Sequence, residues 1–309
     1  MTGILHDDEL VIDAELVRRL VAASVPAYGD LPLRRLDASG SSNVLFRLGD
    51  DLVVRLPRQP GGGSSIGTER RWLRYVASHL AVPVPEIVVV GEPGFGYPEP
   101  WSVVRWLDGE VPAVPERDGA PRSGLAGDLA DVVNALRGLD VPASAVSDPH
   151  LRGYRGRPLL EMDESTRGAI ETSRAIPGLG LDLDACLAVW EEAMRLPGSD
   201  EVVTPRWLHA DLLAENLLVA HGRLAGVLDF GNLTVGEPTA DLAVAWDVLD
   251  PGARESFRHL VDVDDPTWLR GRAWALALGL MTFPYYWATM PARCRSRVAM
   301  CHAVLADAG

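Results

Sequence analysis

Three polar residues in the segment from position 209 to 231 have the types and spacing needed for phosphoryl transfer. The run HADLLAEN puts Asp211 and Asn216 five positions apart, and Asp229 follows in the tripeptide DFG. A transferred phosphoryl group has a loose, charge-rich transition state, which is stabilised by position and counter-charge rather than by covalent attack. Asp211 would hold the acceptor hydroxyl and take its proton, whereas Asn216 and Asp229 would bind Mg²⁺, a hard cation that prefers oxygen ligands. The pattern predicts Asp211 as the catalytic residue and the other two as metal ligands.

The residues between the two predicted metal ligands favour this interpretation over a chance occurrence of short motifs. Two apolar runs, LLV and LAGVL, flank the dipeptide His221-Gly222, and such a turn between apolar runs is typical of a β-hairpin. A hairpin brings the residues before and after it to the same end of its ladder. Both metal ligands would then face one site, and His209 would brace the loop rather than take part in chemistry.

Composition indicates a soluble globular protein with room for two lobes. The chain has 309 residues, of which 47% are apolar and 23% charged, which is ordinary for such proteins. The three cysteines are an odd and sparse set, which argues against a disulfide framework and favours a reducing compartment. The acidic start, MTGILHDDEL, lacks the basic and apolar regions of a signal peptide. We therefore expect a cytoplasmic protein.

Charge and hydropathy argue against two classes of partner. The chain has 29 basic and 43 acidic residues, a net charge of −14, which repels phosphate backbones and predicts no binding of nucleic acid. Residues 273–292 form an uncharged stretch of 20 residues, long enough to cross a bilayer. The stretch also contains Pro284 and two tyrosines, and an all-round apolar helix is equally typical of a buried helix. We predict a buried helix and no membrane partner.

Periodicity predicts a sheet-rich first part and a helical second part. The first part has helical patterns at 7–24 and 66–80 and strand patterns at 33–37, 44–48, 52–56, 86–90 and 101–107. After a Pro- and Gly-rich loop at 111–122, helices are predicted at 123–139, 182–196, 239–249, 266–283 and 293–306. Residues 140–181 contain several prolines and glycines and have no clear prediction.

With these residues in view, the chain resembles the aminoglycoside phosphotransferase family of small-molecule kinases over nearly its whole length. Besides the catalytic block, the resemblance rests on VVRLPR at 53–58, SVVRWLDGE at 102–110, VGEPTADLAVAW at 235–246 and FPYYWATMP at 283–291. It implies an α+β, bilobal, protein-kinase-like fold. Residues 1–107 would form a small antiparallel-sheet N-lobe that binds nucleotide, and residues 108–309 a larger, mainly helical C-lobe with the catalytic loop and the substrate site. Asp241 would support the catalytic loop.

The resemblance also implies where the nucleotide binds. Arg55 occupies the place of the strand lysine that grips the phosphates in kinases, and its expected partner is Glu69, the only acidic residue between positions 51 and 86. Arginine is longer and planar, so its phosphate contact is not equivalent. The small residues of ASGSSN would cover the phosphates with backbone N–H groups, although the run has no GxGxxG. The residues predicted to contact nucleotide are Ser41, Ser42, Asn43, Arg55, Glu69, Val104, Arg105 and Leu107, and Arg58 is a further basic candidate.

The catalytic loop departs from the family at two positions. Ala210 replaces a common glycine, and Leu213 stands where the family often has a histidine and protein kinases a lysine. A side chain that could touch the γ-phosphate is therefore missing from the loop. We expect activity to persist, with slower transfer or a different phosphate contact.

The resemblance implies a kinase that moves the γ-phosphate of ATP or GTP, with Mg²⁺, onto a hydroxyl of an antibiotic and so confers resistance. An aminoglycoside, a macrolide and a basic peptide antibiotic all remain open as acceptors. Acidic residues such as Asp247 would suit an ammonium-binding pocket, and aromatic residues such as Trp246 and Tyr286 a larger apolar one. The alternatives are a kinase of a metabolite or natural product, and a nucleotide-binding pseudokinase suggested by Arg55 and Leu213. The intact metal ligands argue against the pseudokinase.

Overall fold

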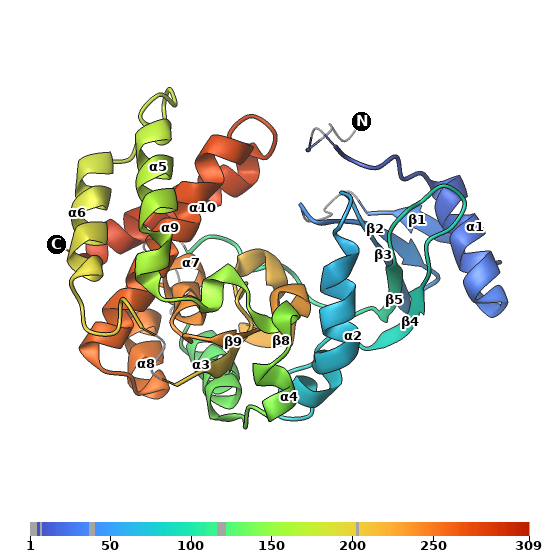
Figure 1. Ribbon diagram of the computed structural model, residues 1–309, viewed down its shortest axis with the longest axis horizontal. Helices are drawn as coiled ribbons and strands as arrows, with labels where there is room; N and C mark the ends of the chain where they lie inside the picture. Colours follow the sequence, from blue (N-terminus) through green and yellow to red (C-terminus); the bar gives the residue numbers. More distant parts are fainter. Residues whose placement is uncertain (1–4, 7, 37–40, 116–121, 202–203, 309) are drawn as a thin grey trace. The chain divides into compact units, whose positions relative to one another are not determined.

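The computed structural model describes residues 5–6, 8–36, 41–115, 122–201 and 204–308, and these fall into two compact units (Figure 1). The small unit lies within Met1–Ser78, Pro83–Asp108 and Leu228–Gly231. The large unit lies within His79–Val82, Gly109–Val227 and Asn232–Gly309. The division into a nucleotide lobe ending at residue 107 and a substrate lobe starting at 108 stays a prediction.

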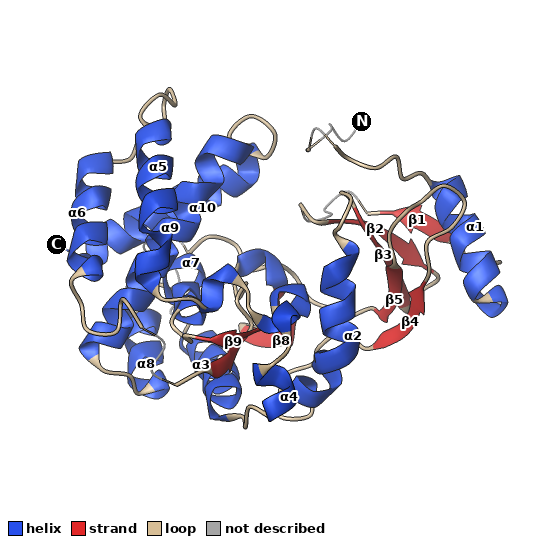
Figure 2. Ribbon diagram, viewed as in Figure 1, coloured by secondary structure: helices blue, strands red, loops and turns tan. Residues whose placement is uncertain are grey.

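The small unit is built on a five-stranded antiparallel sheet, as the sequence predicts. The strand order is β1 (Leu33–Arg35), β2 (Asn43–Leu48), β3 (Leu52–Pro57), β5 (Trp101–Arg105) and β4 (Ile87–Gly91). Two helices, α1 (Ala14–Ser24) and α2 (Gly63–Ala77), lie on the two sides of this sheet (Figure 2). Because both faces are covered, every residue of the central strand β3 is buried.

The two faces of β3 carry different kinds of side chain. Successive side chains of a strand point to opposite faces, and Val54 and Leu56 join the apolar core that also contains Leu20 of α1. Arg55 therefore points to the face covered by α2. Helix α1 is shorter than the predicted helix at 7–24, because the side chain of Asp13 caps it by accepting a hydrogen bond from the backbone N–H of Leu16 at 2.8 Å.

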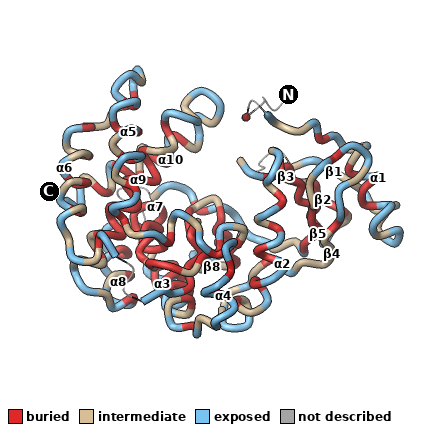
Figure 3. Tube along the Cα trace, in the orientation of Figure 1, coloured by how far each residue is buried: buried red, intermediate tan, exposed pale blue. Residues whose placement is uncertain are grey.

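The large unit is mainly helical and packs around one long buried helix. Its helices are α3 (Ser123–Gly138), α4 (Ala143–Val146), α5 (Asp163–Ser173), α6 (Leu183–Met194), α7 (Val244–Val248), α8 (Pro251–Val261), α9 (Asp265–Tyr286) and α10 (Pro291–Ala308). Helix α9 contacts α5, α6 and α10 and is buried along most of its length (Figure 3). The buried helix predicted from the uncharged stretch 273–292 is confirmed for its first part, where residues 273–280 and Phe283 are buried. The second part differs, because α9 ends at Tyr286 and residues 284–292 are exposed or half-buried. Within the described residues, none of the helices combines the length and apolar character needed to cross a membrane.

Several features of the large unit differ from the sequence-based prediction. Helix α5 was not predicted because the residues that it buries, Thr166, Ala169, Ile170 and Ser173, are mostly small or polar and produce little apolar periodicity. Helix α8 was also missed, although its N-cap residue Asp250 is followed by a proline. The helix predicted at 239–249 is instead a 3₁₀ turn, η7 (Ala240–Ala243), followed by α7, and the buried Asp241 lies in that turn.

Two short antiparallel pairs complete the large unit. Strands β7 (Leu217–Ala220) and β8 (Arg223–Val227) form the predicted hairpin. Its turn residues have the positive φ of a type I′ turn, 51° at His221 and 74° at Gly222. Strands β6 (Arg206–Leu208) and β9 (Thr234–Gly236) also pair, and at three residues each they are too short to be predicted from alternation.

Candidate active site

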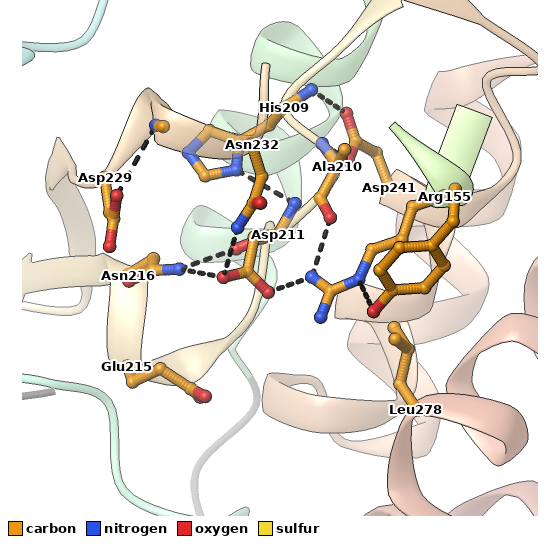
Figure 4. A network of polar contacts seen from close by, with 12 residues as sticks. Arg155, His209, Ala210, Asp211, Glu215, Asn216, Asp229, Asn232, Asp241 and Leu278 are labelled. Carbon is orange, nitrogen blue, oxygen red and sulfur yellow. Dashed lines mark hydrogen bonds and ion pairs between the residues drawn. The ribbon is translucent and has the colours of Figure 1, made fainter. Parts of the chain in front are cut away.

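The catalytic loop follows β6 and is held in place by one buried carboxylate. Asp241 accepts hydrogen bonds from the backbone N–H groups of His209, at 2.6 Å, and Ala210, at 2.8 Å (Figure 4). The ring Nδ1 of His209, which is fully buried, accepts a hydrogen bond from the backbone N–H of Asp211 at 3.2 Å. The expectations that Asp241 supports the loop and that His209 braces it are both confirmed.

The backbone conformation at position 210 accounts for the glycine that the family resemblance implies there. Its φ is 63°, in the left-handed region that favours glycine. A glycine would adopt the conformation without the steric cost that the alanine side chain adds.

Asp211 and Asn216 meet within the loop. The Asn216 side-chain nitrogen donates to the Asp211 carbonyl oxygen at 2.9 Å and to its carboxylate Oδ2 at 3.1 Å. Asn232, just beyond the DFG tripeptide, donates to the same Oδ2 at 3.4 Å. The five-residue spacing therefore brings these two predicted residues together, and the amide orients the carboxylate.

Arg155 is a site residue that the sequence analysis missed. Its Nη1 donates to the other carboxylate oxygen of Asp211, Oδ1, and to the carbonyl oxygen of Ala210 at 2.7 Å (Figure 4). Burial by itself would raise the pKa of Asp211, but the charge of Arg155 and its hydrogen bond hold that pKa below its usual value. Arg155 lies 56 residues before Asp211 in a stretch without periodicity. The sequence offered one indirect signal for a distant cation: the loop from His209 to Asn216 contains no basic residue other than its histidine.

A second arginine of the large unit ties the loop to α10. The buried Arg297 donates to Asp247 Oδ1 at 2.8 Å and to both carboxylate oxygens of Glu215 at 2.6 Å. Asp247 also accepts from the backbone N–H of Ala214 at 2.7 Å, and Arg293 pairs with Glu215 at 2.8 Å. Asp247 is therefore a buried support of the catalytic loop and not part of an ammonium-binding pocket.

The small unit contains the predicted ion pair between Arg55 and Glu69. Nη1 of Arg55 lies 2.8 Å from Glu69 Oε2, and the two side chains are 8% and 1% exposed. Burial raises the pKa of Glu69, and Arg55 opposes this shift. The Arg55 Nη2 also lies 3.4 Å from Oδ1 of Asp229, whose φ is 57°. Three predicted residues far apart in sequence thus meet in this unit, and their nucleotide contact stays a prediction.

The remaining residues predicted to contact nucleotide are more dispersed. Asn43 opens β2 and is buried, and its Oδ1 has no hydrogen-bond partner among the described residues. Val104 is buried on β5, whereas Arg105 is exposed and pairs with Glu86 at 3.0 Å. Ser41 and Ser42 precede β2, and Leu107 follows β5. The first part of the predicted phosphate loop, residues 37–40, lies outside the described residues.

Arg58, the second basic candidate, has another partner. It forms an ion pair with Glu9 in the segment before α1. Arg55 is thus the better supported of the two basic candidates. All 29 basic residues other than histidine are arginines, since the chain contains no lysine. The choice of arginine rather than lysine at position 55 is therefore the same as at every other basic position of the chain.

The chemistry of Asn216 and Asp229 fits a magnesium ion. The hydrogen bonds of the Asn216 amide described above are donated by its nitrogen, so its oxygen Oδ1 is the atom suited to a cation. The contacts of Asp229 with Arg55 and with the Gly231 N–H use Oδ1, which leaves Oδ2 as a second hard oxygen donor.

The buried Arg–Glu pair of the sheet and the braced loop with its paired Asp and Asn side chains are the features that the sequence analysis expects of a phosphotransferase. Residues 34–274 match the phosphotransferase enzyme family, and the chain belongs to that family. The enzyme class predicted from the sequence is thereby confirmed.

Known relatives agree with this assignment. The chain is 25% identical over 237 residues to an aminoglycoside 3'-phosphotransferase of Escherichia coli, covering 74% of this chain and 78% of the relative. The solved GDP complex of wild-type aminoglycoside 2'-phosphotransferase-IIIa has a similar fold, with a TM-score of 0.70, 17% identity, and coverage of 96% of this chain and 100% of that one. The macrolide 2'-phosphotransferase of Brachybacterium faecium is also similar, with a TM-score of 0.60, 21% identity, and coverage of 94% and 97%. The predicted α+β fold, bilobal as in these enzymes, is confirmed.

Proposed function

We propose that this protein is a small-molecule kinase that transfers the γ-phosphate of ATP or GTP to a hydroxyl group of an antibiotic. The observation that carries the proposal is the Asp211 carboxylate, which is oriented by Asn216 in a loop braced by Asp241. An oriented, ionised carboxylate can accept a hydrogen bond from an acceptor hydroxyl and later its proton. The reaction is proposed to occur in the cytoplasm, in keeping with three cysteines that are all free and buried.

Each predicted residue has one task in this proposal. Asp211 holds the acceptor hydroxyl, and Asn216 and Asp229 hold magnesium, which neutralises phosphate charge when bound. Arg55, fixed by Glu69, offers a planar guanidinium to the nucleotide phosphates. Backbone groups near Arg105 and Leu107 bind the base, and Ser41, Ser42 and Asn43 lie near the phosphates.

Similar proteins support the two substrates of the proposed reaction. Solved structures with similar folds contain GDP, ADP or ATP, so both guanine and adenine nucleotides occur in this group. Others contain the aminoglycosides kanamycin, streptomycin or gentamicin, and two are macrolide 2'-phosphotransferases. These compounds define the first panel of acceptors to test.

One observation favours a second candidate, a kinase of a weakly charged metabolite or natural product. Three carboxylates of the catalytic loop and its support are already paired: Asp211 with Arg155, and Glu215 and Asp247 with Arg297. A polycationic aminoglycoside would find little uncompensated negative charge at these three groups. The pseudokinase alternative is less well supported. The chain contains no lysine at all, so an arginine at position 55 is not by itself a sign that catalysis has been lost.

The proposal is tested by measuring nucleoside diphosphate release from Mg·ATP or Mg·GTP by the purified protein. The acceptors are kanamycin, gentamicin, a macrolide such as erythromycin, and a basic peptide antibiotic. Asp211→Asn should lower turnover by roughly 10²–10⁴-fold, the usual contribution of a positioned base. Asp229→Ala should abolish use of the magnesium nucleotide, and Arg55→Ala should mainly weaken nucleotide binding. Asp131→Asn, at an exposed position of α3, is the matched control.

The outcomes separate the candidates. Turnover with one antibiotic class, absent in Asp211→Asn and retained in Asp131→Asn, would establish the kinase and its acceptor together. Nucleotide binding without turnover on the antibiotics would favour the metabolite kinase, to be pursued with neutral polyols and amino alcohols. An Asp211→Asn variant with an undiminished rate would refute the role of Asp211.

A further inference from the structure

The carboxylate of Asp211 has a cationic neighbour that does not come from the catalytic motif. Arg155 lies in a 3₁₀ turn, η3 (Tyr154–Gly156), and its Nη1 contacts both Asp211 Oδ1 and the Ala210 carbonyl oxygen. The guanidinium Nε donates to the Tyr154 hydroxyl at 2.8 Å, which fixes the orientation of the fork. The arginine is thus attached to the loop at two consecutive residues rather than to the carboxylate alone.

The turn that carries Arg155 packs closely against strand β9. The backbone N–H of Glu237, just after β9, donates to the Gly156 carbonyl oxygen at 2.7 Å. A Cβ atom added to Gly156 would lie 2.4 Å from the Thr234 side chain, and one added to Gly153 would lie 2.5 Å from it. The two glycines let the turn approach β9 closely, and β9 pairs with the strand that leads into the catalytic loop. Arginine and loop therefore share one rigid support.

We propose that Arg155 is a positioning residue for the phosphoryl transfer, which holds the Asp211 carboxylate in the orientation that receives the acceptor hydroxyl. Asn216 and Asn232 hold one carboxylate oxygen, and Arg155 holds the other. A carboxylate oxygen has two lone-pair directions, so Oδ1, which accepts from Arg155, can still accept a hydrogen bond from a substrate, whereas the two asparagines use both directions of Oδ2. The inference rests on the proposed function, since it assigns Arg155 a role only through Asp211.

The partial exposure of this pair distinguishes it from a purely internal ion pair. The side chains of Arg155 and Asp211 are 17% and 19% exposed, whereas the Arg297–Asp247 pair behind the loop is 3% and 1% exposed. The first pair therefore lies where a ligand can reach it, and the second supports the loop from within. Arginine fits this position because its planar fork reaches the loop with Nη1 and the Tyr154 hydroxyl with Nε, and the compact ammonium of a lysine lacks this fixed, planar arrangement of donors.

The test compares Arg155→Ala and Arg155→Lys with Arg157→Ala, a matched control whose side chain is 55% exposed and forms a surface ion pair with Glu161. Diphosphate release is measured from Mg·ATP and Mg·GTP, with water, kanamycin and erythromycin as acceptors. We expect Arg155→Ala to lower kcat by roughly 10²-fold, the effect of a small misplacement of a reacting group, with an unchanged KM for nucleotide. Arg155→Lys should be intermediate, and added guanidinium ion at concentrations that leave the wild type unaffected should partly restore Arg155→Ala.

The possible results distinguish a positioning role of Arg155 from a structural role and from a failure of the proposed function. Activity of Arg155→Ala equal to that of Arg157→Ala would overturn the inference while leaving the proposed function intact, provided that Asp211→Asn is inactive. A loss in Arg155→Ala that neither lysine nor guanidinium relieves, together with a lower urea midpoint of unfolding, would show a merely structural role and would also overturn it. If the wild type transfers phosphate to none of these acceptors, or if Asp211→Asn is fully active, the proposed function fails and the inference fails with it.

Discussion

The buried ion pair of the small unit offers a quantitative test of how the sheet and α2 are joined. The perturbation is Glu69→Ala, which removes the carboxylate and leaves the Arg55 guanidinium, 8% exposed, without its main partner. Removing one member of a buried pair costs about 3–5 kcal/mol, because an uncompensated charge stays in a poorly solvated site. Asp229 lies 3.4 Å from the same guanidinium and compensates part of this charge. We therefore expect the lower end of the range, about 3 kcal/mol.

The same unit contains a matched control. Arg105 and Glu86 form an ion pair whose side chains are 55% and 69% exposed, and such surface pairs contribute only about 0–1 kcal/mol. Glu86→Ala should therefore hardly change the free energy of unfolding. The double variant Arg55→Met with Glu69→Leu should be less destabilised than Glu69→Ala, since it leaves no buried charge behind.

The assay is urea unfolding followed by far-UV circular dichroism, with the free energy taken from midpoint and slope. The reasoning would be refuted if Glu69→Ala lost no more free energy than Glu86→Ala. It would also be refuted if the double variant lost more than the single one, because charge burial would then not be the cause.

Three further predictions concern the catalytic loop and the core. Ala210→Gly should keep full turnover and change the free energy of unfolding by no more than about 1 kcal/mol, since relief of the left-handed strain roughly offsets the entropy of glycine; a large loss in urea unfolding would mean that the alanine methyl is needed for packing. Asp241→Asn should cost about 1.5–3 kcal/mol, because an amide offers one acceptor to two N–H donors and hydrogen bonds to a charged group contribute that much; an unchanged urea midpoint would contradict its supporting role. Cys301 should resist thiol reagents in the native protein and react fully in urea, because burial raises its pKa well above the usual value; rapid native labelling, detected by mass spectrometry, would show that α10 opens readily.

Much of the site could be predicted because its residues lie close together in the sequence. Asp211 and Asn216 are joined by one loop, so their spacing alone implies that their side chains meet. The hairpin was predictable for the same reason, since a His-Gly turn between two apolar runs is a local signal. Central strands were predicted well because apolar runs bounded by turn residues need no knowledge of the partner strand.

Other features depended on contacts that have no local signal. Helix α5 buries small and polar residues, and the strands β6 and β9 are three residues long, so neither produces a clear period. The carboxylate of Asp247 looked like a candidate for ammonium binding until the structure showed it paired with Arg297. A sequence records that a residue is charged but not which opposite charge it meets.

The sequence by itself determined the chemistry: an Asp–Asn loop, a second Asp in DFG, an Arg–Glu pair and the phosphotransferase family. These follow from residue types at short spacing and from motifs that need few long-range contacts. Only the tertiary structure decided how the Asp211 carboxylate is held, because Arg155 reaches it from 56 residues away, whereas the support of the loop by Asp241 was already implied by the family resemblance. Long-range ion pairs depend on how the chain folds back on itself, and no local pattern of residues specifies that.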